Sequence, residues 1–256
     1  RTSISQIEAE TSLSRGTIQN IIKDSLGLRK ISSRWIPHNL TTAHKKKRVK
    51  HCKDNLHMFK TGKWRLCDII TGEEMWVYQR QVGIRTTNAC WIGYGEPPRT
   101  VVVRNRFEPK NKFSIFFKTN GPVLVDCMPT GKTINAYYYV NKCLKPVVKE
   151  INKQRPTSGT KNMNIHHDNA TPHAAKMVKT FIEKAGMKIV PHPPYSPDLA
   201  PCDFWLFSLI KRQLSDHNNE TTLKSKITAI LKNISKEEYQ LAFDKWLERM
   251  QLCIKH

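Results

Sequence analysis

The chain has 256 residues, 39% of them apolar, so it can form one large domain or two smaller ones and bury a hydrophobic core. Lys and Arg number 43 against 21 Asp and Glu, and the formal net charge of +22 predicts a polyanionic partner: a nucleic acid, an acidic membrane surface or an acidic protein. No segment approaches the roughly 18 consecutive apolar residues of a membrane span, and no signal-peptide pattern opens the chain. Seven scattered cysteines without a C-x-x-C pair argue against a disulfide framework or a zinc ribbon and favour a reducing compartment. Because the first residue is Arg1, we expect the chain to begin inside a longer gene product.

Residues 1–30 predict two short helices separated by a turn. Ser14 is a suitable N-cap for the second helix, Gly27 is a suitable stop, and the apolar face between them carries Ile18, Ile21 and Ile22. A helix-turn-helix DNA reader and a solvated pair of amphipathic helices are equally compatible with this stretch alone, and the net charge favours the reader. The side chains suited to base edges and phosphates in a major groove are Arg15, Thr17, Gln19, Asn20 and Lys23.

Residues 31–60 predict a connector followed by a basic helix that Thr41 or Thr42 can cap. The basic residues include Lys45, Lys46, Lys47 and Arg48. They are compatible with phosphate contacts, with a plain solvated face or with a nuclear import signal.

Residues 61–256 predict a domain of alternating strands and helices. Asn120-Gly121 is a strong hairpin signal between two apolar runs. Hairpin strands followed by a β-α-β-α order predict a mixed sheet with helices on both faces. The expected strands are 65–78, 112–117, 122–125, 162–167 and 188–190, and the expected helices are 133–151, 172–185, one after Pro201, 221–233 and 235–254.

Three acidic residues lie at expected strand ends or at a helix start: Glu73, Asp168 and Asp203. Carboxylates from separate elements can converge on Mg²⁺, which prefers oxygen ligands. Two such ions activate a water or a 3′-hydroxyl and stabilise the leaving oxygen of an in-line displacement. Taken singly, an acid in such a place is more often a turn or cap residue.

Two segments give this pattern a specific resemblance. Residues 166–173 read HHDNATPH and residues 192–204 read HPPYSPDLAPCDF, and 34 residues separate Asp168 from Asp203. These segments closely resemble the catalytic segments of mariner-family transposases. The chain is equally similar to the transposase-derived half of a histone-methyltransferase fusion. Residues 35–40, WIPHNL, look like the interdomain linker of the family, and residues 69–74, IITGEE, look like the strand that carries its first catalytic acid.

The resemblance implies an α/β fold, in which an RNase H-like mixed β-sheet flanked by helices follows a small all-α helix-turn-helix segment. It also implies that the residues before Trp35 are the second of two modules that bind terminal inverted repeats in double-stranded DNA, with the first module missing. Segment 80–110 resembles the loop that reaches a partner subunit, so a homodimer is implied, held by this loop and by linker residues Trp35, Pro37 and His38. Catalysis would require two Mg²⁺ or Mn²⁺ ions held by Glu73, Asp168 and Asp203.

The chain departs from the family at the first acid, where the family has Asp and this chain has Glu73. The extra methylene displaces the carboxylate, and a misplacement of about 1 Å in a tuned site costs on the order of 10²-fold in rate. Glu74 and Asp68 are candidate substitutes. We therefore expect metal binding by Asp168 and Asp203, while full cleavage activity is in doubt.

Two other signals are set aside. Gly131-Lys132-Thr133 resembles the tail of a phosphate-binding P-loop, but the glycine required five positions before Gly131 is Asp126. The histidines near Asp168 do not form an H-E-x-x-H zinc motif. The leading prediction is a nuclear transposase or transposase remnant without a membrane partner or nucleotide cofactor. The alternatives are a domesticated DNA-binding protein that has lost cutting and, less favoured, a nuclease of the same fold that acts on RNA.

Overall fold

A computed structural model describes residues 4–28, 39–78, 109–129, 131–214 and 220–255. The chain divides into two compact units, residues 1–39 and 40–256, which are treated separately below. Two predicted dimer contacts lie outside the described residues: the linker residues Trp35, Pro37 and His38, and nearly all of segment 80–110. None of the described helices combines the length and the apolar character needed to cross a membrane.

The first unit consists of α1 (Ile4–Thr11), α2 (Arg15–Asn20) and the π-helical turn η1 (Ile21–Ser25). Ser14 caps α2 as predicted, because its side chain accepts a hydrogen bond from the Thr17 amide. Of the predicted apolar face only Ile18 is buried, and Ile21 is 38% exposed. From Ile21 the helix continues as a π-helical turn with i→i+5 hydrogen bonds, so the 3.6-residue spacing that predicted one shared apolar face no longer applies there.

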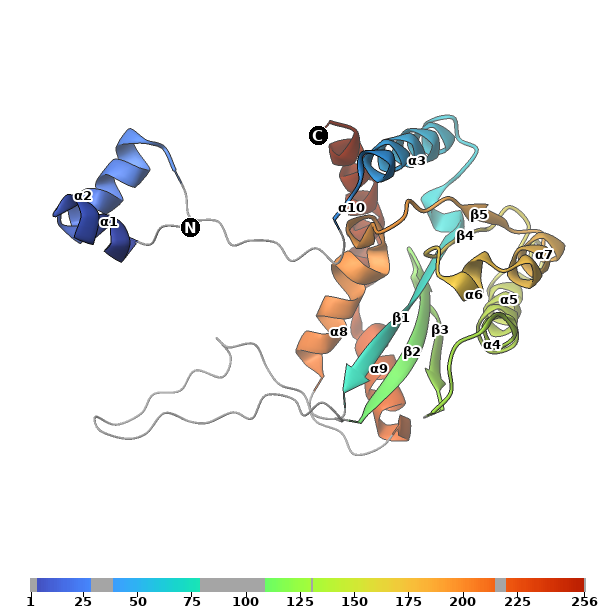
Figure 1. Cartoon of the computed structure of the whole chain (residues 1–256). Helices are drawn as coiled ribbons and strands as arrows, with labels where there is room; N and C mark the ends of the chain where they lie inside the picture. The colour runs from blue at the N-terminus through green and yellow to red at the C-terminus, as the bar shows by residue number, and fades with distance from the viewer. Residues whose placement is uncertain (1–3, 29–38, 79–108, 130, 215–219, 256) are drawn as a thin grey trace. The chain divides into compact units, whose positions relative to one another are not determined.

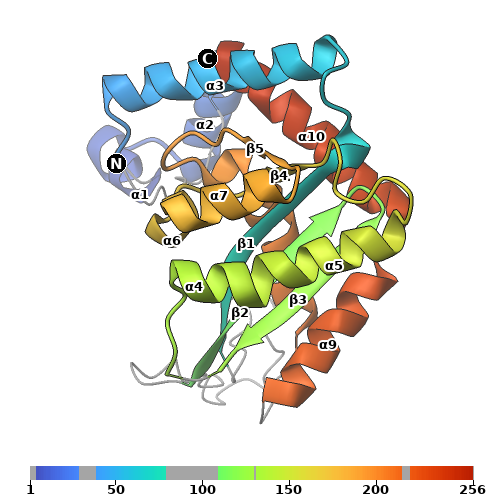
Figure 2. The same ribbon diagram turned by 90° about the vertical axis from the view of Figure 1, so that its right-hand side faces the viewer.

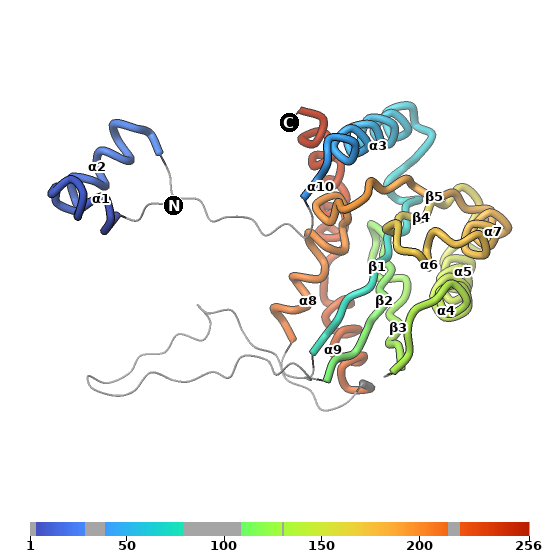
Figure 3. The backbone as a smooth tube through the Cα atoms, in the orientation of Figure 1, coloured from blue at the N-terminus to red at the C-terminus, as the bar shows by residue number. Residues whose placement is uncertain are grey.

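The second unit is organised around a five-stranded sheet in the order β3-β2-β1-β4-β5 (Figure 1). The β2–β3 pair forms the predicted hairpin, β1 pairs with β2 antiparallel, and β1 and β4 run parallel. The parallel pair β4–β5 is joined through two short helices, α6 and α7, which the tube view follows clearly (Figure 3). The mixed sheet is therefore confirmed. Its strands are β1 (Ile69–Tyr78), β2 (Lys110–Lys118), β3 (Gly121–Met128), β4 (Asn164–His166) and β5 (Lys188–Val190).

Helices cover both faces of this sheet, as predicted (Figure 2). One face packs against α3, α8, α9 and α10, and the other packs against the run from α4 to α5 and against α7. Helix α3 packs against α10. The helical elements of this unit are α3 (Thr42–Lys60), η2 (Leu66–Asp68), α4 (Ala136–Tyr138), η3 (Tyr139–Leu144), α5 (Lys145–Gln154), α6 (Thr171–Ala174), α7 (Lys176–Lys184), η4 (Pro197–Leu199), η5 (Cys202–Leu206), α8 (Phe207–Gln213), α9 (Glu220–Asn233) and α10 (Lys236–Lys255).

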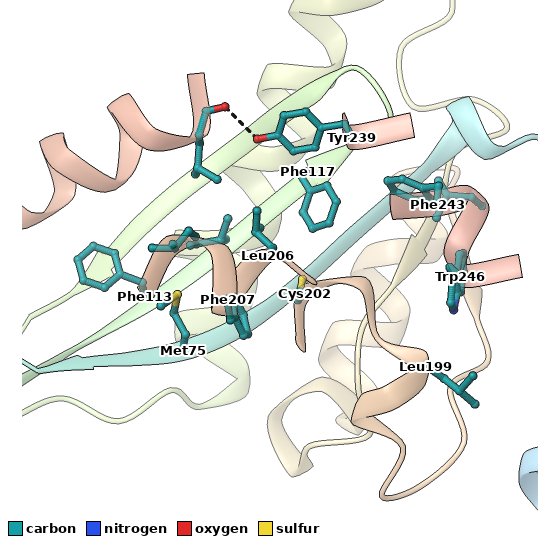
Figure 4. Close-up of a cluster of buried hydrophobic side chains, with 14 of the residues drawn as sticks. Met75, Phe113, Phe117, Leu199, Cys202, Leu206, Phe207, Tyr239, Phe243 and Trp246 are labelled. Atoms are coloured by element: carbon teal, nitrogen blue, oxygen red, sulfur yellow. Dashed lines mark hydrogen bonds between the residues drawn. The ribbon is translucent and has the colours of Figure 1, made fainter. Parts of the chain in front are cut away.

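Aromatic side chains fill the core between the sheet and the C-terminal helices (Figure 4). Phe117 of β2 lies with its ring centroid 5.6 Å from that of Tyr239 and 5.7 Å from that of Phe243, both on α10. The Tyr239 hydroxyl donates to the Leu231 carbonyl at 3.0 Å, so the buried phenol keeps a partner. This core holds η5 and α10 against β1, and it therefore sets the position of Asp203.

The hydrophobic core on the other face of the sheet, against α5 and α7, depends on a close approach between two neighbouring strands. Gly72 of β1 pairs with Phe116 of β2, and a Cβ atom at Gly72 would lie 2.1 Å from Cδ1 of Phe116. The Phe116 ring is fully buried, and its centroid lies 6.2 Å from that of Tyr139 in η3. The ring thus occupies space that any larger residue at position 72 would need.

Arg48 has a different role from the predicted phosphate contact. Its guanidinium donates two hydrogen bonds to the Asp198 carboxylate, at 2.8 Å and 2.6 Å, and only 13% of its side chain is exposed. Arg249 of α10 donates to the Asp198 carbonyl at 3.2 Å. The two arginines thus hold the segment that leads into Asp203 against α3 and α10.

We expect Asp198→Asn to lower the free energy of unfolding by about 1 kcal/mol, because the substitution breaks a bidentate ion pair whose carboxylate is half-exposed. Urea unfolding followed by tryptophan fluorescence measures the change. The matched control is Asp54→Asn on the exposed face of α3, for which the change should stay within about 0.5 kcal/mol. Equal changes in the two variants would show that the Arg48–Asp198 pair does not hold this segment.

Candidate active site

The register of β1 and β4 places two of the predicted acids side by side. Thr71 of β1 pairs with His166 of β4, and Glu73 and Asp168 each follow two residues later in the same direction. Asp203 is the second residue of η5, which packs against β1 through the buried Cys202. Residues far apart in the chain therefore approach one another where the two parallel central strands run side by side.

The charges of these acids affect one another. Burial and the negative charges of Asp168, Glu74 and Asp203 hold the pKa of Glu73 well above its usual range. Partial burial and the charge of Asp168 raise the pKa of Asp203 to about 6. Carboxylates that raise one another's pKa values form a site that a cation stabilises.

His173 of α6 supplies positive charge to this site. Its Nδ1 lies 2.6 Å from Oδ1 of Asp168, and its Nε2 lies 3.4 Å from Oε1 of Glu74. Burial opposes the charged form of His173, but the contacts with Asp168 and Glu74 outweigh burial and raise its pKa to about 10. For Asp168, burial raises the pKa, whereas the hydrogen bonds from His173 and the Ala170 amide lower it, and the net pKa falls below its usual value.

Glu73 and Glu74 project to opposite faces of β1, because successive strand residues alternate. Glu74 lies on the face of α6 and contacts His173, whereas Glu73 is on the face of η5. Glu74, named as a substitute from the sequence, is therefore part of the acidic cluster, while Asp68 is paired with Arg65 at 2.7 Å and Arg155 at 3.5 Å. Sequence reasoning missed the bridging role of His173, although its spacing of five residues from Asp168 was visible.

The other histidines near the acids form a buried structural chain. His166 contacts the Thr71 hydroxyl through Nδ1 and His192 through Nε2, both at 3.0 Å. Burial lowers the pKa of His192 to about 4 and that of His166 well below its usual value, so both rings are neutral at pH 7. Asn169 donates to the His192 carbonyl at 2.7 Å. These contacts hold the loop after β5 beside Asp168.

The chemistry of the acids fits a divalent cation that prefers oxygen ligands, such as Mg²⁺. In the described part of the chain, however, no three His, Cys, Asp or Glu side chains are placed to hold one ion together. His173 occupies part of the space between Asp168 and Glu74 and provides the countercharge. The side chains of the cluster are thus close enough to interact and are not arranged as a closed coordination shell.

The predicted DNA-contacting residues lie on exposed surfaces of each unit. On α2 and η1, Gln19 is partly exposed, and the others are exposed: Arg15, Thr17, Asn20 and Lys23. On α3, the three consecutive lysines of the basic stretch are exposed: Lys45, Lys46 and Lys47. Their exposure is compatible with phosphate contacts and equally with a solvated face.

Comparisons with known proteins find relatives and solved structures that are similar to this chain. The profile of a family described as transposase (partial DDE domain) matches residues 84–161. The Mariner Mos1 transposase of Drosophila mauritiana is 24% identical over 253 residues, which is 97% of this chain and 72% of that protein. The histone-lysine N-methyltransferase SETMAR of Homo sapiens is 24% identical over 255 residues, which is 99% of this chain but 36% of that protein. The solved Mos1 transposase paired-end complex with left transposon end matches with a TM-score of 0.85 at 24% identity, covering 100% of this chain and 74% of that one.

The fold is RNase H-like, and the acidic cluster described above lies at its central strands. The motif order, the family profile and two relatives that align along nearly the whole chain agree. Along nearly its whole length the chain is similar to the Mos1 mariner transposase and to SETMAR, so it resembles mariner-family transposases.

Proposed function

We propose that this chain binds the terminal inverted repeats of a transposon as double-stranded DNA and carries a site for DNA cleavage and strand transfer. The observation that carries the proposal is the packing that brings three acids from separate elements together: Glu73 and Asp168 each follow the Thr71–His166 pair of the parallel strands by two residues, and η5, which carries Asp203, contacts β1. Residues 1–30 read the repeat, residues 31–60 contact phosphates and connect, and residues 61–256 hold the catalytic site.

In this proposal, Glu73, Asp168 and Asp203 hold two divalent ions, Mg²⁺ or Mn²⁺. Bound there, the ions supply an activated water or 3′-hydroxyl and stabilise the leaving oxygen. His173 positions the Asp168 carboxylate by a 2.6 Å hydrogen bond and balances its charge. Arg48 binds Asp198 and Asn169 binds the His192 carbonyl, so both side chains hold the loop between β5 and η5 in place. This loop leads into Asp203 and passes beside Asp168.

The relatives support the partners and the cofactor of this proposal. Paired-end complexes of Mos1 have been solved with Mn and with Mg, and another contains the left transposon end. For this chain we infer the same classes of ligand, a homodimer that pairs two ends, and a nuclear location where such DNA is found. The excess of 43 basic over 21 acidic residues fits a DNA partner.

A second function is supported by one specific residue. Glu73 stands where the family has Asp, and its longer side chain changes the reach of the first carboxylate. A domesticated protein that keeps DNA binding without cutting would tolerate this change. The two functions differ in one measurable property, the metal-dependent nicking of transposon-end DNA.

The decisive experiment incubates the chain with duplex DNA that carries the inverted repeat flanking its own coding sequence, with Mg²⁺ or Mn²⁺. We expect nicking at the repeat end that Asp168→Ala abolishes, because Asp168 is the acid bound by His173 at the centre of the cluster. Binding without nicking by the native chain supports the non-catalytic protein. Equal cleavage of RNA, with no preference for the repeat, would contradict both functions and support the RNA nuclease.

A further inference from the structure

A group of basic and aromatic side chains lies beside Glu74, on the face of the sheet to which Glu74 projects. Side chains of β1, β2 and β3 form rows across the strands, and one row consists of Glu74, Ser114 and Asp126. The next row consists of Trp76, Lys112 and Met128. Because two strand residues advance about 7 Å, this second row lies one short step from Glu74.

This row forms the floor of a cavity of about 350 Å³. The loop after β3 contributes Lys132 and Thr133 to the cavity wall, and Lys110 contributes from the start of β2. Among the described residues that line it, three are lysines and none is an Asp or a Glu. The cavity therefore favours an anion although its neighbouring row is acidic.

Aromatic rings hold one of these lysines in position. The Lys110 ammonium lies 4.5 Å from the ring centroid of Trp76 and 5.8 Å from that of Tyr78. The Lys112 ammonium lies 5.7 Å from the Trp76 centroid. Cation–π attraction of this kind restrains a long side chain that would otherwise move freely in solvent. Less conformational entropy is then lost when an anion binds.

The loop after β3 adds a third cation and a hydroxyl. Gly131 adopts a positive φ of 79°, and the Lys132 amide donates to the Pro129 carbonyl at 3.2 Å, which closes a turn. Both Lys132 and Thr133 are exposed and line the cavity. The Gly-Lys-Thr tripeptide is not a P-loop, but this turn places its lysine and threonine at the wall of the cavity.

We propose that this cavity binds a backbone phosphate of the DNA. In this arrangement, the phosphodiester linkage next to that phosphate on the same DNA strand lies at the acidic cluster. The proposal rests on the proposed function and adds a named phosphate-binding site to it. Lys110, Lys112 and Lys132 contact the phosphate oxygens, and Trp76 holds Lys110 for this contact. The positive charge of the cavity offsets the repulsion between the DNA strand and the carboxylates of the acidic cluster. The cavity also determines how far the DNA strand extends past Glu74.

The test measures binding of repeat-carrying duplex DNA to the full chain in EDTA, so that no cleavage is needed. In Lys112→Ala/Lys132→Ala, we expect affinity near physiological salt to fall on the order of tenfold or more, and the slope of log affinity against log salt to fall by about 2. The matched control, Lys149→Ala/Lys153→Ala, removes the same charge from exposed positions of α5 outside the cavity. Urea unfolding confirms that the variants fold.

Lysine acetylation read by mass spectrometry gives a local readout. We expect DNA to protect Lys110, Lys112 and Lys132 from acetylation and to leave Lys149 and Lys153 reactive.

Protection by inorganic phosphate alone, without protection by DNA, would overturn the proposal in favour of a small-anion site. If native chain binds or nicks repeat DNA while the cavity lysines stay reactive, the cavity proposal is wrong and the proposed function stands. If the lysines are protected by any duplex without repeat preference, the cavity proposal stands and end recognition is wrong. Absence of all DNA binding overturns both.

Discussion

Replacing Glu73 by Asp should raise metal-dependent nicking of transposon-end DNA on the order of 10²-fold. Glu73 and Asp168 each lie two residues beyond the Thr71–His166 pair of the parallel strands, and the charges of Asp168 and Asp203 help to raise the pKa of Glu73. Removing one methylene draws that carboxylate back toward β1 and restores the length that the family has at this position. Mg²⁺ requires near-ideal octahedral geometry, so the gain should be larger with Mg²⁺ than with Mn²⁺ if geometry is the cause.

Initial nicking rates at saturating metal, measured on the same duplex for both proteins, give the ratio. Glu74→Asp is the matched control, because it makes the same chemical change one residue later, on the opposite face of β1. We expect no gain in that variant, since shortening Glu74 moves it away from His173. An equal gain in both variants, or none in Glu73→Asp, would show that the length of Glu73 does not limit this site.

Replacing Gly72 by Ala should lower the free energy of unfolding of the second unit by about 3 kcal/mol. The new Cβ atom would lie 2.1 Å from Cδ1 and 2.3 Å from Cε1 of Phe116, well inside contact distance. Phe116 is fully buried against Tyr139, so its ring cannot move aside without disturbing the core. A loss of this size is a large fraction of the 5–15 kcal/mol that typically stabilises a domain.

Urea unfolding of Gly72→Ala, Phe116→Leu and the double variant measures the effect and its cause. If the clash is responsible, the double variant should lose less stability than the sum of the two single changes, because the shorter leucine makes room for the methyl group. Gly16→Ala is the control, since the nearest atom to its added Cβ is Oγ of Ser14 at 4.0 Å. Simple additivity of the two changes would contradict a steric origin.

Local patterns in the sequence were sufficient for most of the secondary structure. Asn120-Gly121 predicted the β2–β3 hairpin, and the side-chain cap of Ser14 was correctly placed. Thr41 caps α3 with a reciprocal contact from His44, as one of two predicted caps. These features depend on residues within a few positions of one another, so the chain order alone specifies them.

The sequence also determined which acids to consider, because their order and spacing resemble a known family. It could not determine which neighbour each acid meets. That depends on strand register and on packing across the fold: β1 and β4 bring Glu73 beside Asp168, although 94 residues lie between them. The alternation of side chains along β1 sends Glu74 to His173, and the core around α10 sets the position of Asp203.

Arg48 shows that the sequence does not determine the partner of a basic residue either. In the sequence it is one cation in a basic run, indistinguishable from Lys47. Only the packing of α3 against the loop after β5 brings it within 2.8 Å of Asp198 and turns a predicted phosphate contact into an internal ion pair. Composition and short-range spacing thus determined the elements and the candidate residues. The tertiary structure decided their partners, because a charge or an acid acts through the groups that long-range packing places around it.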